Sequence, residues 1–97
     1  MDEMMKLWRY LTEHDYCVRW EYRIAPLTIF SHTEDLYRNQ IIVYDREDGT
    51  RLWDAICHPG SYGYEQGLLE IYGVICNDVI GCLTADDIIK ILTKQEE

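Results

Sequence analysis

The sequence predicts a small α+β domain in which helices pack on one face of a mostly antiparallel sheet. Apolar residues recur at helical spacing near both ends of the chain, and they alternate with polar residues between positions 17 and 24. A charged turn also joins two strand-like segments on either side of residues 45–49. Since the chain has only 97 residues, we expect a single domain spanning residues 1–97.

The N-terminal segment has the pattern of an amphipathic helix that ends near His14. Asp2 is a suitable N-cap, and the apolar positions that follow it form one stripe: Met4, Leu7, Trp8 and Leu11. Residues 17–24 alternate, which is typical of a half-buried strand, and Pro26 is expected to end that strand. Residues 27–30 suggest a further short strand, but the pattern across 25–38 determines no structure.

The clearest element of the predicted sheet is a hairpin over residues 40–57. Residues 40–44 are apolar on both faces, as in a central strand, and residues 45–49 supply turn chemistry that ends on Gly49. Residues 50–57 then return as the partner strand. Trp53 lies at a core position of this strand by its period.

The C-terminal third predicts two helices. Residues 58–63 combine a proline with two glycines and must be irregular. Residues 64–72 then carry apolar side chains at helical spacing, with a glycine where a helix would end: Leu68, Leu69, Tyr72 and Gly73. Thr84 with Asp87 forms a capping box for the last helix. The expected architecture is therefore a sheet of two to four strands, an N-terminal helix and two C-terminal helices.

The charge is strongly acidic and uneven. Eighteen acidic residues against nine basic ones give a net charge of −9. The segment between Arg51 and Lys90 contains no Lys or Arg, but it contains these acids: Asp54, Glu65, Glu70, Asp78, Asp86 and Asp87. A domain that neutralises phosphates needs a basic patch, so we expect no direct nucleic-acid binding. The same field attracts basic protein surfaces.

Neither a secretory signal nor a membrane span is predicted from the sequence. The first residues lack a basic region followed by an apolar run, and no apolar stretch approaches the roughly 18 residues that a span requires. We therefore expect a cytoplasmic location and no membrane partner. In that compartment the four cysteines should be free thiols that pack as small apolar side chains: Cys17, Cys57, Cys76 and Cys82.

Metal and cofactor sites are not expected. Zinc modules bring their ligands in close pairs, whereas Cys57 and His58 are adjacent and would point to opposite sides of an extended segment. The same two residues, with Ser61 and the nearby Asp54, suggest an alternative function as a small-molecule-binding or enzymatic domain. No local signature of a nucleophile accompanies them, so we assign no catalytic residue and expect binding rather than catalysis.

The glycine-rich loop and the acids after it are the candidate partner-binding site. Tyrosine gives a large contact area at low entropic cost, and two tyrosines lie in this loop. The candidate residues are Tyr62, Tyr64, Glu65, Glu70 and Asp78. The function expected is a small acidic protein-binding domain, an inhibitor or adaptor, whose partner has a basic surface. One form of this hypothesis is a nucleic-acid mimic of the phage or mobile-element anti-defence type; a toxin–antitoxin or regulatory component is another protein-binding form.

Overall fold

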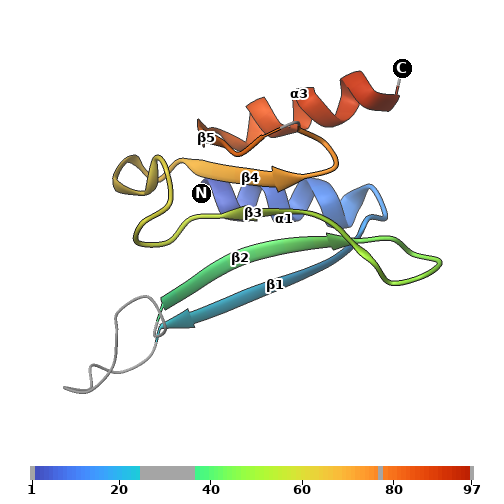
Figure 1. Ribbon diagram of the computed structural model, residues 1–97, viewed down its shortest axis with the longest axis horizontal. Helices are drawn as coiled ribbons and strands as arrows, with labels where there is room; N and C mark the ends of the chain where they lie inside the picture. The colour runs from blue at the N-terminus through green and yellow to red at the C-terminus, as the bar shows by residue number, and fades with distance from the viewer. Residues whose placement is uncertain (1, 25–36, 77, 97) are drawn as a thin grey trace.

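The computed structural model describes residues 2–24, 37–76 and 78–96 of the chain (Figure 1). The described part begins with a helix and ends with a helix, and five strands lie between them. The elements in chain order are α1 (Glu3–Glu13), β1 (Cys17–Ile24), β2 (Tyr37–Tyr44), β3 (Arg51–Ile56), the 3₁₀ turn η1 (Tyr64–Gln66), β4 (Leu69–Gly73), β5 (Ile80–Leu83) and α3 (Ala85–Glu96).

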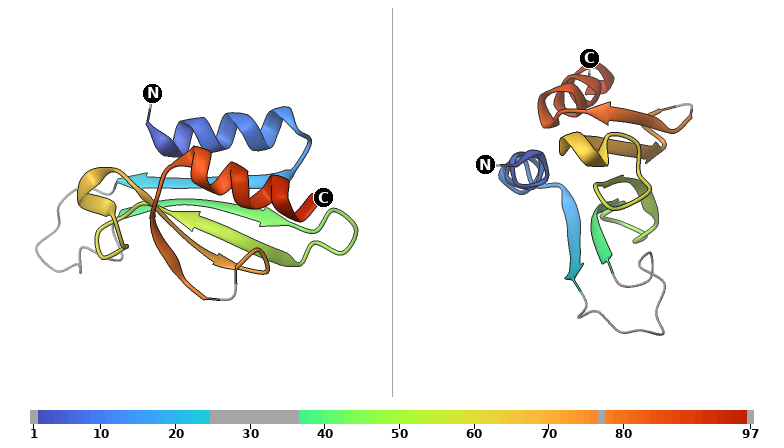
Figure 2. Two further views of the ribbon diagram at one scale, coloured as in Figure 1. Left: turned by 90° about the horizontal axis from the view of Figure 1, so that it is seen from above. Right: turned by 90° about the vertical axis from the view of Figure 1, so that its left-hand side faces the viewer.

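The five strands form one antiparallel sheet in which each strand pairs with the next along the chain. The strand order is β1-β2-β3-β4-β5, with β1 and β5 at the two edges. Both helices lie on the same side of the sheet, which the two views of Figure 2 show. We call the side that faces α1 and α3 the inner face, and the opposite side the outer face.

The core lies between the inner face and the two helices. Alternate residues of β2, β3 and β4 point into it, and α1 and α3 each add one apolar stripe. Its buried members are Met4, Leu7, Leu11, Ile41, Val43, Trp53, Ala55, Leu69, Ile71, Ile75, Ala85, Ile88 and Leu92. The predicted core position of Trp53 is confirmed, since its side chain is only 3% exposed.

Both predicted helix caps are confirmed. The Asp2 carboxylate accepts a hydrogen bond from the Met5 backbone N–H at 2.7 Å, which satisfies a free donor of the first turn of α1. At the start of α3, the Asp87 N–H donates to Thr84 Oγ1 and the Thr84 N–H donates to Asp87 Oδ2, at 3.1 and 3.0 Å. This reciprocal pair is the capping box predicted from the sequence.

The α+β class and the central hairpin are confirmed, but the number of strands and of C-terminal helices was wrong. The sheet has five strands rather than two to four. The predicted helix over 64–72 is instead the short turn η1 followed by β4, so α3 is the only C-terminal α-helix among the described residues. Gly67 adopts a left-handed conformation, with φ of 72°, which ends the turn before a helix can propagate. The short strand expected at 27–30 lies outside the described residues.

Candidate protein-binding surface

The outer face of the sheet is not covered by either helix. The helices contact each other and the two edge strands, all on the inner side. Because side chains alternate along a strand, the outer face receives Leu52, Asp54 and Ile56 from β3, and Glu70 and Tyr72 from β4. The outer face of this five-stranded sheet is therefore left without a helical layer.

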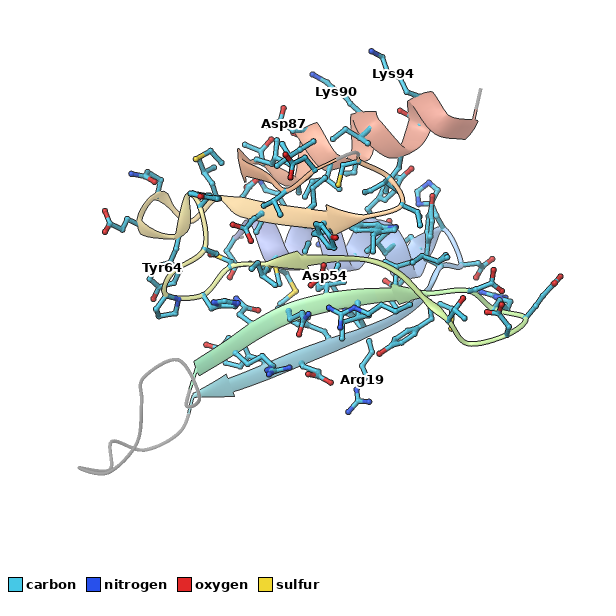
Figure 3. All side chains as sticks on the ribbon, viewed as in Figure 1. Arg19, Asp54, Tyr64, Asp87, Lys90 and Lys94 are labelled. Atoms are coloured by element: carbon cyan, nitrogen blue, oxygen red, sulfur yellow. The ribbon has the colours of Figure 1, made fainter. Side chains whose placement is uncertain are left out.

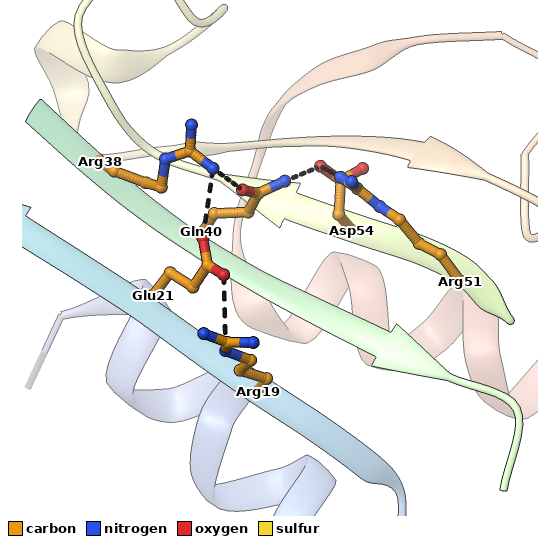
Figure 4. A network of polar contacts seen from close by, with 6 residues as sticks. All are labelled: Arg19, Glu21, Arg38, Gln40, Arg51 and Asp54. Atoms are coloured by element: carbon orange, nitrogen blue, oxygen red, sulfur yellow. Dashed lines mark hydrogen bonds and ion pairs between the residues drawn. The ribbon is translucent and has the colours of Figure 1, made fainter. Parts of the chain in front are cut away.

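Over β1, β2 and β3 the outer face carries a chain of polar contacts, drawn in Figure 4. Glu21 accepts from Arg19 Nε and Arg38 Nη1 at 3.4 and 3.2 Å, and Arg38 also donates to Gln40 Oε1 at 3.3 Å. Gln40 Nε2 then donates to Asp54 Oδ2 at 2.7 Å. Arg51 Nη2 forms a salt bridge with the same Asp54 oxygen at 2.8 Å and is the last member of the network. This network pairs its three arginines with two carboxylates, so this part of the outer face carries both signs of charge.

Next to the network the same face is hollowed and apolar. A depression of about 840 Å³ lies over β3, β4 and the segment that follows β4. Its apolar lining includes Leu52, Ile56, Tyr72, Val74 and Val79. Tyr72, Val74 and Val79 are 61%, 70% and 41% exposed, which is unusual for large apolar side chains that line one depression. We call this feature the outer-face depression.

Carboxylates dominate the charged groups around the outer-face depression. Asp54, Glu70 and Arg51 line it, and Asp78 directly precedes Val79. Arg51 is paired with Asp54, as described above. Glu70 and Asp78 accept hydrogen bonds from backbone N–H groups, of Tyr62 and Val79 respectively, but neither forms a salt bridge with a described residue. One carboxylate that lines the depression, Glu70, and one next to a lining residue, Asp78, therefore have no cationic partner in the described part of the chain.

The loop before β4 brings Tyr62 to this side of the sheet. Its backbone N–H donates to Glu70 Oε1 at 3.0 Å, and its ring is 67% exposed. Two glycines allow the loop to approach β5 so closely: a Cβ on Gly81 would collide with the Tyr62 Cβ, and a Cβ on Gly63 would lie 2.9 Å from the Cys82 Cα. Gly63 also has φ of 87°, which favours glycine. Tyr62 is thus held in place by backbone packing while its side chain stays accessible.

The five predicted partner-binding residues do not form one cluster. Glu70 lines the outer-face depression, while Tyr62 is bonded to Glu70 and Asp78 flanks Val79. Tyr64, labelled in Figure 3, lines a second depression together with Glu65 and residues from the start of α1. Tyr72, Val74 and Val79 were missed by sequence reasoning. An alternating reading of residues 69–73 places Tyr72 on the opposite face from Leu69 and Ile71, and that signal could have identified it.

His58 and Ser61, two residues of the alternative enzymatic site, form hydrogen bonds within a local turn. Ser61 Oγ donates to the His58 carbonyl oxygen at 2.7 Å and accepts from the His58 N–H at 3.1 Å. His58 Nδ1 lies 3.1 Å from the Pro59 carbonyl oxygen. Burial raises the pKa of the Cys57 thiol, and the Asp2 carboxylate raises it further, so the reactive thiolate is disfavoured. No observation of this geometry favours a nucleophile with its general base.

The cysteines occupy two different environments, which corrects one expectation. All four are unpaired in the structure. Cys57 and Cys76 are half-buried against the core, but Cys17 and Cys82 are exposed rather than packed as small apolar side chains. Both exposed residues lie on edge strands, where one side has no neighbouring strand among the described residues. Cys82 also has φ of 57°, uncommon for a residue with a side chain.

Comparison with known proteins yields no relative: no family model, no curated protein and no solved structure matches this chain. Among residues 2–24, 37–76 and 78–96, no three His, Cys, Asp or Glu side chains lie close enough together to hold a metal ion. No helix in the same ranges is long and apolar enough to cross a membrane. The surfaces described above are therefore the basis for a functional proposal.

Proposed function

We propose that this chain is a small acidic protein-binding domain of the inhibitor or adaptor kind. It docks its partner on the outer-face depression. The observation that carries the proposal is an uncovered sheet face on which exposed Tyr72, Val74 and Val79 surround a hollow of about 840 Å³. Contiguous exposed apolar groups with a polar border are typical of protein-interaction sites.

The charge around the depression selects the chemistry of the partner. Glu70 and Asp78 form no salt bridge with a described residue, and the chain carries a net charge of −9. A partner that presents several apolar side chains next to Lys or Arg would occupy the hollow and pair these carboxylates. Tyr62 and Tyr72 then serve as aromatic anchors, the residue type that most often dominates binding energy. The carboxylates would act mainly on the rate of association.

A narrower form of the proposal is a nucleic-acid mimic. In this form the partner is a nucleic-acid-binding protein, and carboxylates of the chain occupy sites that otherwise bind phosphates. The acidic composition supports this form, but the arginine network on β1 to β3 gives the outer face a mixed charge. Competition between the chain and DNA for the purified partner distinguishes the mimic from an inhibitor or adaptor that binds elsewhere.

The proposal is tested by comparing capture from the native host with matched variants. The wild-type chain, the double variant Tyr72→Thr/Val74→Thr and a control variant Thr93→Ala on the exposed side of α3 are used as baits. We expect at least one protein to be retained by wild type and control but lost with the double variant. Equal retention by all three baits would overturn docking at the depression.

The electrostatic part is tested on the purified partner. Glu70→Gln and Asp78→Asn remove charge but keep an oxygen that can accept the same backbone hydrogen bonds. Together they should slow association and flatten its dependence on salt, while the control pair Glu13→Gln/Asp86→Asn should have a smaller effect. If neither salt nor the Glu70 and Asp78 substitutions change the affinity for the partner, the partner surface is not basic.

A further inference from the structure

A second depression, away from the outer face, lies between the start of α1, the end of β1 and the loop before β4. Its volume is about 430 Å³, within the range of small-ligand sites, which is about 300–1,000 Å³. Its lining includes the carboxylates of Asp2, Glu3 and Glu65, the rings of Tyr22 and Tyr64, and the amide of Asn39, besides Met4, Cys57 and Gly67. Tyr22 and Asn39 come together because they are register partners on β1 and β2.

The carboxylates of this second depression are unequal. Glu3 is already engaged, since its Oε1 accepts from the Ala85 N–H at 2.8 Å and its Oε2 pairs with Lys6 Nζ at 3.2 Å. Asp2 uses one oxygen to cap α1, and Glu65 forms no salt bridge with a described residue. No Lys or Arg lines the hollow. Two carboxylates therefore face it without a cation, more charge than the roughly half positive charge at the start of a helix offsets.

Asn39 supplies an independent sign that the hollow is built to bind a ligand. Its side chain is only 8% exposed, and its Oδ1 accepts a hydrogen bond from Trp20 Nε1 at 2.7 Å. This bond fixes the orientation of the amide. The Nδ2 group forms no hydrogen bond with any residue in the described ranges. Every fully buried side-chain nitrogen or oxygen in those ranges has a hydrogen-bond partner, so Nδ2 is not fully buried. The Asn39 amide NH2 thus keeps access to the hollow that the side chain lines, as a donor that has no acceptor among the described residues.

We propose that the second depression binds a lysine or arginine side chain of the partner protein. The ammonium or guanidinium group lies between Asp2 and Glu65, and the rings of Tyr22 and Tyr64 flank it through cation–π contact. The adjacent peptide carbonyl of the partner accepts the free hydrogen bond from Asn39 Nδ2. This inference rests on the proposed function, because it identifies a residue that the basic partner must present.

The test uses a defined small molecule and needs no partner. The full ¹⁵N-labelled chain is titrated with N-acetyl-arginine amide or N-acetyl-lysine amide, and the indole resonance of Trp20 and side-chain amide resonances of Asn39 are followed by NMR. We expect both sets to shift in a saturable way. The uncharged analogue N-acetyl-citrulline amide should produce no saturable shift, since it lacks the charge that the carboxylates recognise.

Matched variants locate the effect. Asp2→Asn keeps a good helix cap, and Glu65→Gln changes an exposed side chain, so the double variant should fold normally. It should weaken binding of N-acetyl-arginine amide at least about tenfold. The pair Glu13→Gln/Asp86→Asn removes the same charge elsewhere and should leave the affinity within about twofold. An equal loss of affinity in both double variants would mean that binding depends only on net charge, and it would overturn the proposal.

Two further results would also overturn the inference. One is the absence of any saturable shift of the Trp20 and Asn39 resonances with either cationic amide. The other is binding of spermidine without binding of N-acetyl-arginine amide, which would assign the hollow to a free polyamine rather than to a protein side chain. Tyr72→Thr/Val74→Thr lies outside the lining of this hollow and should leave the titration unchanged. Failure here is thus separable from failure of docking at the outer-face depression.

Discussion

The two faces of the sheet are built from the same strands but have opposite surroundings. On the inner face, Trp53, Leu69 and Ile71 are at most 3% exposed, because α1 and α3 close over them. On the outer face of the same strand β4, Tyr72 is 61% exposed. Because successive side chains of a strand point to opposite faces, one strand supplies both buried core residues and exposed surface residues. Inner-face residues stabilise the fold, while exposed outer-face residues such as Tyr72 can change with little effect on stability.

The outer face is itself divided. Ile42 is only 4% exposed although no helix lies over it, and its register partners Arg19 and Asp54 both belong to the polar network. The network thus screens the apolar side chain beneath it over β1, β2 and β3. Over β4 and the residues after it, nothing in the described ranges plays this part for Tyr72 and Val74. On the outer face, exposed large apolar side chains therefore gather around the outer-face depression, as expected of an interaction site.

The largest effect is expected on the inner face, at Trp53. Trp53→Ala should lower the free energy of unfolding by roughly 3–5 kcal/mol, because it removes a large buried aromatic and leaves a cavity. Chemical denaturation measures this loss. If the variant does not fold, Trp53→Phe should retain the fold at a smaller cost. A change near zero would place Trp53 outside the core.

The capping box of α3 should give an intermediate effect. Thr84→Ala removes the oxygen that accepts from the Asp87 N–H and should cost about 1 kcal/mol of unfolding free energy. Thr93→Ala, in the exposed last part of α3, is the matched control and should change stability by less than about 0.5 kcal/mol. If the denaturation midpoints of the two variants coincide, the box does not stabilise the helix.

A smaller, pH-dependent effect on the free energy of unfolding is expected from Glu3, which joins α1 to the start of α3. The hydrogen bond from the Ala85 N–H lowers the pKa of the Glu3 carboxyl, with a contribution from Lys6 and against the opposing effect of burial. A carboxyl with a lowered folded pKa stabilises the protein above its unfolded value, about 4.3, and loses this contribution as pH falls through the folded value.

Unfolding free energy should therefore decrease as pH falls below about 4.3. Glu3→Gln should reduce this slope, since glutamine accepts the Ala85 hydrogen bond but does not titrate. Asp87→Asn should reduce it further, because hydrogen bonds with Thr84 also lower the pKa of Asp87. Denaturation series at several pH values measure the slope, and slopes equal to wild type in both variants would contradict the assignment.

The smallest effect on stability is expected on the outer face. Tyr72→Thr keeps a residue that favours strands, and Val74→Thr changes an exposed turn side chain, so each should change the unfolding free energy by less than about 0.5 kcal/mol. Their effect on binding should be larger, with a combined loss of about 2 kcal/mol, mostly through faster dissociation. Surface plasmon resonance with the purified partner measures that loss. A destabilisation like that of Trp53→Ala would mean that the two faces are not separate in function.

The helix caps could be predicted from the sequence, whereas the pairing of strands that are distant in the chain could not. Asp2 and Thr84 act through residues three positions away, so their caps could be predicted from a short window. Leu68, Leu69 and Tyr72 fit a helical spacing, but the pairing of β4 with β3 decides in favour of a strand. β5 has only four residues and includes Gly81, which weakens its pattern.

The candidate site shows the same limit. Tyr62 and Glu70 were identified as charged or aromatic residues near a loop, and the structure joins them by a hydrogen bond. The outer-face depression combines residues from β3 and from the segment after β4, which are about twenty positions apart in the chain. Its existence depends on strand order and on the placement of both helices on one side. Neither is encoded in a local pattern.

The most direct test of the central claim is site-specific photocrosslinking in the native host. Val74→p-benzoylphenylalanine places a reactive group at the outer-face depression, and Lys94→p-benzoylphenylalanine places the same group on exposed α3, labelled in Figure 3. We predict discrete crosslinked products from position 74, absent from position 94, that contain a protein with a basic surface. Identical products from both positions, or none from position 74, would contradict docking on the outer face.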